Sequence, residues 1–339
     1  MILGIIDLGS NSVKLSVYDY EKKREIFAER KVTRLGQDSF ETKILINQAM
    51  ARTLNVLRDF VHKAGDFGAV DVKIVATSCV RDAKNKEEFL ALVKDDLGIE
   101  IKVISGDEEA EIIWSCLVSD NSPSVGRLRG FSEKIPCGGS GCLKNRSSSL
   151  KKEEELCHPP VKIFSTINTT PTLLSCDIGG GSTEFILGKE KIIFKKSLNI
   201  GAVRLYDMFF KNPCDKIGYE KALKYAENLI FPLKNDLKDF QCFVGSSGTF
   251  TNLFDWVKSN GLCEDFCERN VFIGEIHRLL EMPLEERKIQ VGINPDRADI
   301  ICAGGAIIEA LCNVLNVKEI FVTTASLKDG LVLYYNLTT

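Results

Sequence analysis

A glycine-rich stretch near the middle of the chain contains the residue types that bind phosphate groups. An apolar run ends at Asp177, and three glycines and two hydroxyl residues separate it from Glu184 and a second apolar run. This pattern predicts a strand, a tight turn and another strand. Successive backbone N–H groups in a glycine turn can form an anion-binding nest. Because Asp177 and Glu184 would repel a phosphate bound there, the pattern also predicts a hard cation such as Mg²⁺ between them.

This stretch does not match the common nucleotide-binding patterns. It does not contain G-x-x-x-x-G-K-[ST], and Glu184 stands where G-x-G-x-x-G requires its last glycine. For this segment alone, an ordinary glycine-rich hairpin is the alternative interpretation.

The N-terminus repeats the pattern, which favours phosphate binding over the hairpin. Residues 5–15 hold an apolar run, an aspartate, a turn with hydroxyl residues and a second apolar run. An internal repeat at this spacing predicts two similar domains, and two facing turns would hold a polyanion from both sides. The aligned pairs are Asp7 and Asp177, Gly9 and Gly179, Ser12 and Ser182, and Lys14 and Glu184.

Three further segments place polar residues where a predicted strand ends and a helix begins, which is where ligands collect in α/β sheets. Thr77 is a candidate helix cap, and Arg81 one turn later would complete an anion site, unless it pairs with a surface carboxylate. Residues 105–111 begin a helix with acidic side chains, which is also the routine complement of a helix dipole. Residues 244–251 offer N–H and hydroxyl donors, and Arg204 is a further cation for the cleft.

Length and composition restrict the class of protein. The 339 residues suffice for two domains, and the net charge of -3 indicates neither a nucleic-acid-binding nor a polybasic membrane protein. No apolar run approaches the roughly 20 residues that span a bilayer. Because the first predicted strand starts at the N-terminus, no room is left for a signal peptide. The twelve scattered cysteines are therefore expected to be reduced thiols of a cytoplasmic protein.

Two domains with the same order of strands and helices would position these residues. In the first half, hydrophobic periodicity predicts strands at 2–7, 13–18, 25–33, 72–76 and 101–104, with helices at 43–64, 77–96 and from 107. The second half repeats it, with strands at 173–177, 184–187, 192–196, 242–245 and 318–323, and with helices from 201, over 219–238, from 248 to about 315 and over 326–335. The expected fold is α/β, with βββαβαβα domains at 1–118 and 173–326. Residues 327–339 are expected to cross back and pack on the first domain.

The segment at 119–172 differs from the rest of the chain. Hydrophobic periodicity disappears, and glycine, serine, proline and charged residues dominate, which predicts a long loop or mobile insertion. A zinc site is the alternative, although its spacing is irregular and lacks a C-x₂-C pair. Its ligands would be Cys137, Cys142, Cys157 and His158.

Taken in chain order, a series of short motifs resembles the exopolyphosphatase and guanosine pentaphosphate phosphohydrolase (Ppx/GppA) family, within the actin–Hsp70–sugar kinase superfamily. Each motif is weak alone, but their order is specific, and together they cover nearly the whole chain outside the insertion. The motifs are IDLGSNS at 6–12, ATSCVRDA at 76–83, SGDEEAE at 105–111, DIGGGSTE at 177–184, NIGAVRL at 199–205, GSSGTFT at 245–251, and DRAD at 296–299 with GGA at 304–306.

The resemblance implies a fold and a set of site residues. The fold is two ribonuclease-H-like domains, as in actin-like ATPases, around an interdomain cleft. Glu109 would be the general base that activates a water for attack on the terminal phosphorus. Asp177 and Glu184 would hold Mg²⁺, or Mn²⁺, with Asp7 helping from the facing turn. The residues expected to bind phosphate are Gly9, Ser10, Asn11, Thr77, Arg81, Gly180, Gly181, Ser182, Arg204, Gly248 and Thr249.

The resemblance also implies an activity. Release of terminal phosphate from inorganic polyphosphate is the first expectation, and conversion of pppGpp to ppGpp is the close alternative because it uses the same chemistry. Two more distant roles stay open, namely an ATP-dependent kinase or ATPase of the superfamily and a non-catalytic sensor of polyphosphate or ppGpp. A homodimer is expected from the family, and neither nucleic acid nor membrane is expected as a partner.

Near the C-terminus this chain departs from the family pattern. The family sequence resembles Ser-Asp-Ala-Gly-Leu-Arg-Glu-Gly, whereas residues 323–330 read Thr-Thr-Ala-Ser-Leu-Lys-Asp-Gly. An acidic residue, a glycine and an arginine are replaced, so the family role of that loop is not carried over. The chain also ends after the second predicted domain, so a weaker grip on long polyphosphate is expected than in longer family members.

Overall fold

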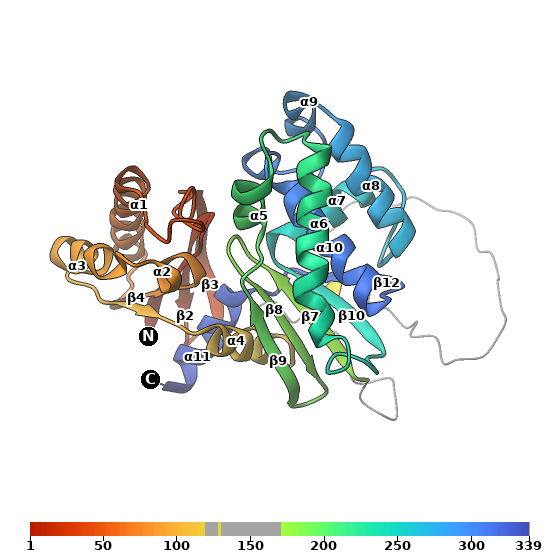
Figure 1. Cartoon of the computed structure of the whole chain (residues 1–339). Helices are drawn as coiled ribbons and strands as arrows, with labels where there is room; N and C mark the ends of the chain where they lie inside the picture. Colours follow the sequence, from red (N-terminus) through yellow and green to blue (C-terminus); the bar gives the residue numbers. More distant parts are fainter. Residues whose placement is uncertain (119–127, 130–170, 339) are drawn as a thin grey trace, which may run out of the picture.

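The computed structural model describes residues 1–118, 128–129 and 171–338. They form two mixed sheets with helices packed on them, and the two sheets lie side by side (Figure 1). Most of the predicted insertion lies outside the described residues. The zinc alternative lies outside them too, with its ligands Cys137, Cys142, Cys157 and His158.

The first sheet has five strands in the spatial order β3-β2-β1-β4-β5. The first three form an antiparallel meander, and β4 and β5 continue the sheet parallel to β1. Its strands are β1 Ile2–Leu8, β2 Ser12–Asp19, β3 Arg24–Val32, β4 Asp71–Ala76 and β5 Ile101–Val103. Its helices are α1 Asn47–Asp66, α2 Ser78–Asp82, α3 Lys86–Leu97 and α4 Gly106–Val118.

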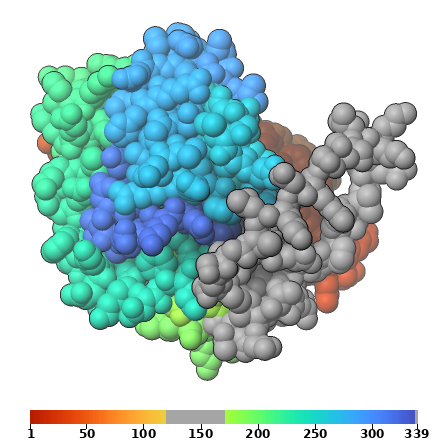
Figure 2. Space-filling model, turned by 90° about the vertical axis from the view of Figure 1, so that its right-hand side faces the viewer, coloured from red at the N-terminus to blue at the C-terminus, as the bar shows by residue number. Residues whose placement is uncertain are grey.

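The second sheet has the order β9-β8-β7-β10-β12-β11, and β6 also pairs with β12. Its strands are β6 Leu128–Arg129, β7 Leu173–Ile178, β8 Thr183–Gly188, β9 Ile192–Leu198, β10 Cys242–Ser246, β11 Cys267–Glu268 and β12 Glu319–Thr323. Its helices are α5 Ala202–Phe209, α6 Lys216–Ile230, α7 Ser247–Ser259, α8 Arg269–Glu281, α9 Leu284–Lys288 and α10 Ile301–Leu315. The terminal helix α11 Leu327–Thr338 follows β12. Figure 2 shows the outer surface of this domain, where α6 (green) lies beside segments from much later in the chain (blue).

The two sheets share one topology. Each has a meander of three strands followed by two parallel strands, so β7, β8, β9, β10 and β12 correspond to β1, β2, β3, β4 and β5. This confirms the predicted α/β class and its repeated βββαβαβα order. The short edge strand β11 was not predicted. The residue boundaries assigned to the two domains stay a prediction.

The helix predicted at 77–96 is wrong, because the structure has two helices, α2 and α3, joined at an extended Ala83. The Asn85 side chain accepts a hydrogen bond from the Leu45 N–H (2.9 Å) and donates one to the Leu45 carbonyl (3.0 Å). These two bonds tie the break to a distant loop, so no local pattern could reveal it. The helix predicted at 219–238 is also too long, because α6 ends at Ile230 and Pro232 follows in a short 3₁₀ turn.

Two helices occupy the space between the sheets. One hydrophobic cluster joins apolar residues of both sheets, such as Ile5 and Phe321, to Trp114 of α4 and Leu331 of α11. The terminal helix α11 packs against α4 and β1, and the Tyr20 hydroxyl donates to the Val332 carbonyl at 2.9 Å. The terminal helix therefore returns to the first sheet, as predicted.

Two further features concern the cysteines and the helices. The cysteines of the described ranges form no disulfide, and most of them are buried. No helix within those ranges combines the length and apolar character that a membrane span requires. Cytoplasmic location stays a prediction.

We predict that Gly330→Ala destabilises the fold. A Cβ at Gly330 in α11 would lie 2.3 Å from the Ile112 carbonyl oxygen of α4, so the two helices would have to separate. We expect the free energy of unfolding to fall by about 1–3 kcal/mol. Thermal denaturation followed by circular dichroism measures this change.

Gly274→Ala is the matched control for this prediction. Gly274 lies in α8, and apart from its chain neighbours and the backbone of its own helix no heavy atom of the described residues lies within 4 Å of the position its Cβ would take. Alanine there should raise stability by about 0.5–1 kcal/mol, because glycine is the weaker helix former. If both substitutions shifted the melting temperature in the same direction, the proposed contact between α4 and α11 would be contradicted.

Candidate active site

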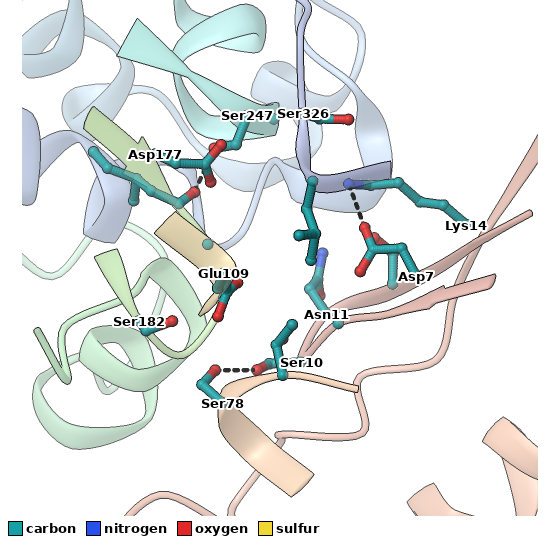
Figure 3. A pocket seen from close by; sticks show the side chains of 18 of the residues that line it. Asp7, Ser10, Asn11, Lys14, Ser78, Glu109, Asp177, Ser182, Ser247 and Ser326 are labelled. Carbon is teal, nitrogen blue, oxygen red and sulfur yellow. Dashed lines mark hydrogen bonds and ion pairs between the residues drawn. The ribbon is translucent and has the colours of Figure 1, made fainter. Parts of the chain in front are cut away.

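A pocket lies between the two sheets, and residues of both domains line it (Figure 3). The turn after β1 and the start of α2 lie on one side, and the turn after β7 and the start of α7 lie on the other. The structure brings together ten of the predicted site residues in this lining: Asp7, Gly9, Ser10, Asn11, Thr77, Glu109, Asp177, Gly180, Ser182 and Gly248.

The two turns have the same internal geometry. Gly9 N donates to the Ser12 carbonyl at 3.1 Å, and Gly179 N donates to the Ser182 carbonyl at 2.9 Å. In the two antiparallel strands that each turn connects, Asp7 lies opposite Lys14 and Asp177 lies opposite Glu184. Residues that align between the two sequence motifs therefore also occupy equivalent positions in the two domains.

The backbone carbonyl groups of each turn accept hydrogen bonds from a neighbouring segment of the same domain. In the first domain, the segment after β3 donates to the carbonyls of Ser10 and Asn11. In the second domain, the first N–H groups of α5 donate to the carbonyls of Gly179 and Gly180 at 2.9–3.0 Å. Because a trans peptide points its N–H opposite to its C=O, the turns direct their N–H groups away from these supports. This arrangement suits an anion held by backbone N–H groups.

Two of the predicted glycines also let the domains approach each other. A Cβ at Gly180 would lie 3.0 Å from the Ser10 Cβ, and one at Gly181 would lie 2.4 Å from the Ser78 Oγ. The sequence interpretation gave these glycines a role toward the ligand alone. The structure adds that the second domain's turn contacts the first domain directly.

Glu109 reaches the pocket from the first turn of α4. A capping box fixes this helix start: Glu108 N donates to the Ser105 hydroxyl (3.1 Å), and Ser105 N donates to the Glu108 carboxylate (2.8 Å). Glu109 is 7% exposed, and its carboxylate accepts a hydrogen bond from Arg81 Nη1 at 3.2 Å. Burial, and then the charge of Glu184, raise the pKa of Glu109 well above its usual value, while Arg81 opposes the shift.

Two further carboxyl groups, those of Asp177 and Glu184, lie close enough to Glu109 to affect its pKa. The Ser246 hydroxyl donates to Asp177 at 2.7 Å, and burial raises the pKa of Asp177. Glu184 is fully buried behind the pocket lining, where the Ser197 hydroxyl donates to its Oε1 at 2.8 Å. Burial, and then the charge of Asp177, raise the pKa of Glu184 to about 7. Its Oε2 is buried and has no hydrogen-bond partner among the described residues.

The structure differs from the metal-binding prediction, which expected three carboxylates to act together as metal ligands. Within the described ranges, no group of three or more His, Cys, Asp or Glu side chains is placed to hold a metal ion. Asp7 is already bonded to Lys14 at 3.0 Å, so its charge is compensated. The unpartnered oxygen of Glu184 and the buried Asp177 do fit Mg²⁺, which usually takes one or two carboxylates together with substrate phosphates. The ion itself stays a prediction.

Arg297 and Lys14 are cations in the pocket lining that the sequence analysis did not assign as site residues. The Arg297 guanidinium packs on Gly248, where a Cβ would lie 2.4 Å from its Cζ, and its buried Nε has no partner among the described residues. Burial, and then the charge of Arg30, lower the pKa of Arg297 to about 10. The signal for Arg297 was present in the DRAD motif, but nothing local placed it in the cleft.

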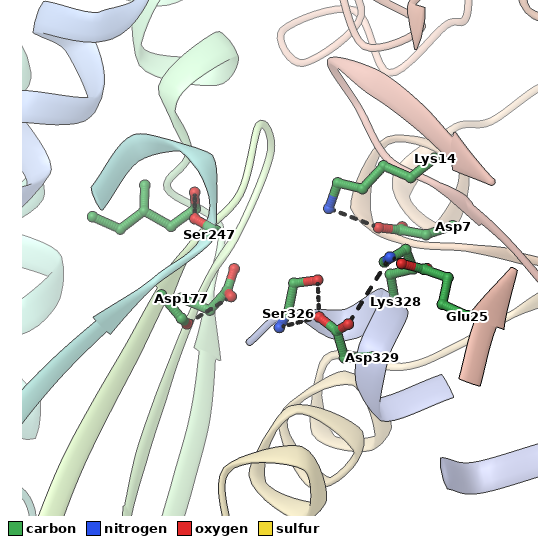
Figure 4. A network of polar contacts seen from close by, with 10 residues as sticks. Asp7, Lys14, Glu25, Asp177, Ser247, Ser326, Lys328 and Asp329 are labelled. Carbon is green, nitrogen blue, oxygen red and sulfur yellow. Dashed lines mark hydrogen bonds and ion pairs between the residues drawn. The ribbon is translucent and has the colours of Figure 1, made fainter. Parts of the chain in front are cut away.

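The C-terminal loop whose sequence departs from the family pattern also lines the pocket, through Ser326 and Leu327. Figure 4 shows Ser326 bonded to the buried Asp329, which accepts hydrogen bonds from the Ser326 N–H (3.0 Å) and hydroxyl (2.9 Å). The neighbouring Lys328 pairs with Glu25 of β3. The position of Ser326 at a strand-to-helix junction was the available sequence signal. The lining also contains Ser12, Ser78, Ile178, Gly179 and Ser247, which were not assigned from sequence.

Five predicted site residues lie outside the pocket lining. Arg81 adjoins it through its bond to Glu109, whereas Glu184 lies behind it and Gly181 faces the first domain. The Thr249 hydroxyl is buried and donates to the Ile178 carbonyl at 3.3 Å. Arg204 is buried and bonds to other protein groups, so direct phosphate binding by Arg204 and Thr249 stays a prediction.

Comparisons with known sequences agree with the motifs. The sequence model of the Ppx/GppA phosphatase family matches residues 17–128 and 153–338. A bifunctional 3-dehydroquinate synthase/phosphatase of Fusobacterium nucleatum is 28% identical over 94% of this chain and 44% of its own length. Exopolyphosphatase 2 of Mycobacterium tuberculosis is 25% identical over 97% of this chain and 96% of its own. A guanosine-5'-triphosphate,3'-diphosphate pyrophosphatase of Vibrio vulnificus is 27% identical over 96% and 57%, respectively.

The chain thus spans about half the length of two of these relatives and nearly all of the third. Among solved structures, an exopolyphosphatase from Cytophaga hutchinsonii aligns with 100% of this chain and 99% of its own, with a TM-score of 0.78 at 23% identity. At that identity the likeness supports the fold.

We predict that Glu184→Gln reduces the loss of stability at high pH. The raised pKa of Glu184, about 7, means that the folded protein keeps a proton that the unfolded chain releases. This contribution is complete below the unfolded pKa and is lost as the pH rises through about 7. Glutamine does not ionise, so the variant should match the parent at pH ~4.5 and exceed it by about 3 kcal/mol at pH ~8.

Melting temperatures in buffers with EDTA, which removes bound metal, measure this effect. Glu190→Gln, at an exposed turn position, is the control and should behave alike at both pH values. A difference between parent and Glu184→Gln that did not change with pH would contradict the raised pKa of Glu184.

Proposed function

Because the chain belongs to the Ppx/GppA phosphatase family, we propose that it hydrolyses the terminal phosphoanhydride bond of inorganic polyphosphate and releases orthophosphate. The exopolyphosphatase of Mycobacterium tuberculosis, which aligns over nearly its full length, supports this choice of substrate. The pocket supports it too, because two N–H-presenting turns on opposite walls suit a chain of phosphates.

The position of Glu109 is the observation that carries the proposal. Its carboxylate lines the pocket between the two turns, beside Asp177 and the cations Lys14 and Arg297. A carboxyl group with a raised pKa is a stronger base than an ordinary one once it is ionised. Arg81 favours the ionised form, so Glu109 is both shielded from bulk water and able to lose its proton.

In the proposed reaction, Glu109 accepts a proton from a water whose oxygen attacks the terminal phosphorus. A bond forms between that oxygen and phosphorus, and the bond from phosphorus to the bridging oxygen breaks with its electron pair on the leaving phosphate. The backbone N–H groups of the turns, Lys14 and Arg297 would bind the phosphate oxygens and stabilise their charge. Asp177 and Glu184 would hold Mg²⁺ or Mn²⁺, which when bound neutralises phosphate charge.

Conversion of pppGpp to ppGpp is the second candidate function. The Vibrio vulnificus relative is named for this activity, and the reaction breaks the same type of bond. The groups in the pocket lining recognise phosphates and not a base, so they serve either substrate. A homodimer and a cytoplasmic location are further proposals that rest on the family resemblance.

We predict that Glu109→Gln lowers the rate of phosphate release by about 10²–10⁴-fold, because glutamine cannot accept the proton. The measurement is phosphate release with Mg²⁺ from long-chain polyphosphate, pppGpp and ATP at matched concentrations. Glu108→Gln is the control: it lies one residue away on α4, and glutamine preserves the capping box. A Glu109→Gln variant as active as the parent would rule out the assigned base.

We also predict that Arg81→Met moves the acidic limb of the kcat/KM profile to higher pH. Activity should rise with pH as Glu109 ionises, and Arg81 lowers the pKa of Glu109. Removing that cation should therefore shift the limb to higher pH. Arg58→Met removes the same charge from an exposed pair with Asp96 and should leave the limb in place. An unchanged limb in Arg81→Met would separate Arg81 from the ionisation of Glu109.

A further inference from the structure

Arg204 connects the two domains at the edge of the pocket. It lies in the first turn of α5, in the second domain. Its Nε donates to the Gly181 carbonyl at 2.7 Å, and its Nη2 donates to the Asp82 carboxylate of α2, in the first domain, at 2.7 Å. The Cζ of the guanidinium lies 4.3 Å from the centroid of the Phe40 ring, also in the first domain. We call Arg204, Gly181, Asp82 and Phe40 the Arg204 clasp.

The environment of the clasp argues for a role in positioning. Arg204 is 7% exposed, and the Asp82 side chain is 23% exposed, so both charges have lost most of their water. Removing a pair of charges from water offsets much of their attraction, and buried ion pairs are best attested as devices that fix one register of packing. The planar fork of arginine is suited to holding two acceptors and an aromatic face at once.

The part that the clasp holds in register is the glycine turn of the second domain. Backbone N–H groups of α5 bond the carbonyls of Gly179 and Gly180, and Arg204 Nε bonds the next carbonyl, that of Gly181. The same side chain then reaches the first domain. A Cβ at Gly181 would lie within 2.8 Å of the Phe40 ring, so the turn and that ring are also in direct contact.

On these contacts, we propose that Arg204 is a positioning residue that sets how the two phosphate-binding turns face each other. It fixes the last peptide of the second turn and ties that peptide to the start of the first domain's α2. The catalytic consequence rests on the proposed phosphatase function, whereas the structural role does not. Arg204 therefore acts on substrate through the turn, without contacting phosphate itself.

The clasp also adjoins the catalytic carboxylate through α2. Asp82 and Arg81 are consecutive residues of this five-residue helix, and Arg81 bonds Glu109. Loss of the Arg204–Asp82 bond would free α2 and the glycine turn to separate. Substrate binding should weaken most, because the donors for one phosphate chain would no longer converge.

Hydrogen–deuterium exchange of the protein without ligand tests the structural role. In Arg204→Gln, amides at 178–184 should exchange at least about tenfold faster, whereas amides of α8, far from the clasp, should not change. Asp82→Asn removes only the charged partner of one of the two Arg204 bonds, so it should have a smaller effect in the same direction. The double variant should be no worse than Arg204→Gln alone, because that substitution already removes the shared bond. Exchange at 178–184 within about twofold of the parent would overturn the proposal.

Arg34→Gln is the matched control, because Arg34 also pairs across the domains, with Asp299 at 2.6 Å, but is more exposed. Its loss should leave exchange at 178–184 unchanged. If Arg204→Gln does not fold, Arg204→Lys decides, since lysine keeps the charge but lacks the fork. Faster exchange in Arg204→Lys supports the clasp, and parent-like exchange contradicts it.

Kinetics test the catalytic consequence separately. With long-chain polyphosphate and Mg²⁺, Arg204→Gln should raise KM by about tenfold or more and change kcat less, which is the pattern of lost substrate binding. A fall in kcat with unchanged KM would contradict positioning by Arg204. If the parent protein released no phosphate from polyphosphate or pppGpp, the proposed function would fail, and the exchange experiment would still decide the clasp.

Discussion

The site depends on carboxyl groups held out of water close to one another. Glu184 and Asp177 both raise the pKa of Glu109, and Asp177 raises that of Glu184, in addition to the effect of burial. The chain maintains this unfavourable arrangement because α4 is packed between the two sheets with its first turn at the pocket. Local contacts that would be unstable alone persist where the surrounding structure determines them, and such strain is typical of functional sites. A proton relieves it, so the ionisation of these carboxyl groups and the stability of the fold share one cause.

The repeat of the two domains is symmetric in backbone and asymmetric in charge. Both turns have the same internal bond and the same support from behind, yet Lys14 faces Asp7 in one domain where Glu184 faces Asp177 in the other. The first turn therefore pairs an acid with a base, whereas the second has two carboxyl groups at the corresponding positions. A polyanion approaching the first turn would meet N–H groups and a cation, whereas at the second turn a bound cation would lessen the repulsion from Asp177 and Glu184. Because of this difference in charge, the two sides of the pocket are not equivalent, although the two domains share one topology.

What the sequence could predict follows from how local each signal is. Apolar runs interrupted by glycine turns reveal strands and their ends, so the repeated topology and the pocket positions of Asp7, Glu109 and Asp177 were accessible. The break between α2 and α3 was not, because the Asn85 side chain satisfies a loop 40 residues away. Phosphate binding by Arg204 was implied by the family resemblance and stays a prediction. Its contacts with Asp82, 122 residues away, and with the Phe40 ring could not be inferred from the motif around it. Residues that reach the pocket through topology, such as Arg297 and Ser326, were missed for the same reason.

The short helix α2 connects these features, because its consecutive residues serve different functions. Arg81 bonds the Glu109 carboxylate at the pocket, and Asp82 bonds Arg204, which also donates to the Gly181 carbonyl of the opposite turn. Five residues are too few for α2 to be stable alone, so its position is set by its contacts. A displacement of α2 would alter both contacts, and moving Arg81 away from Glu109 would weaken the interaction that lowers the pKa of Glu109. The domain contact at Asp82 and the surroundings of the Glu109 carboxylate are thus coupled through one short helix.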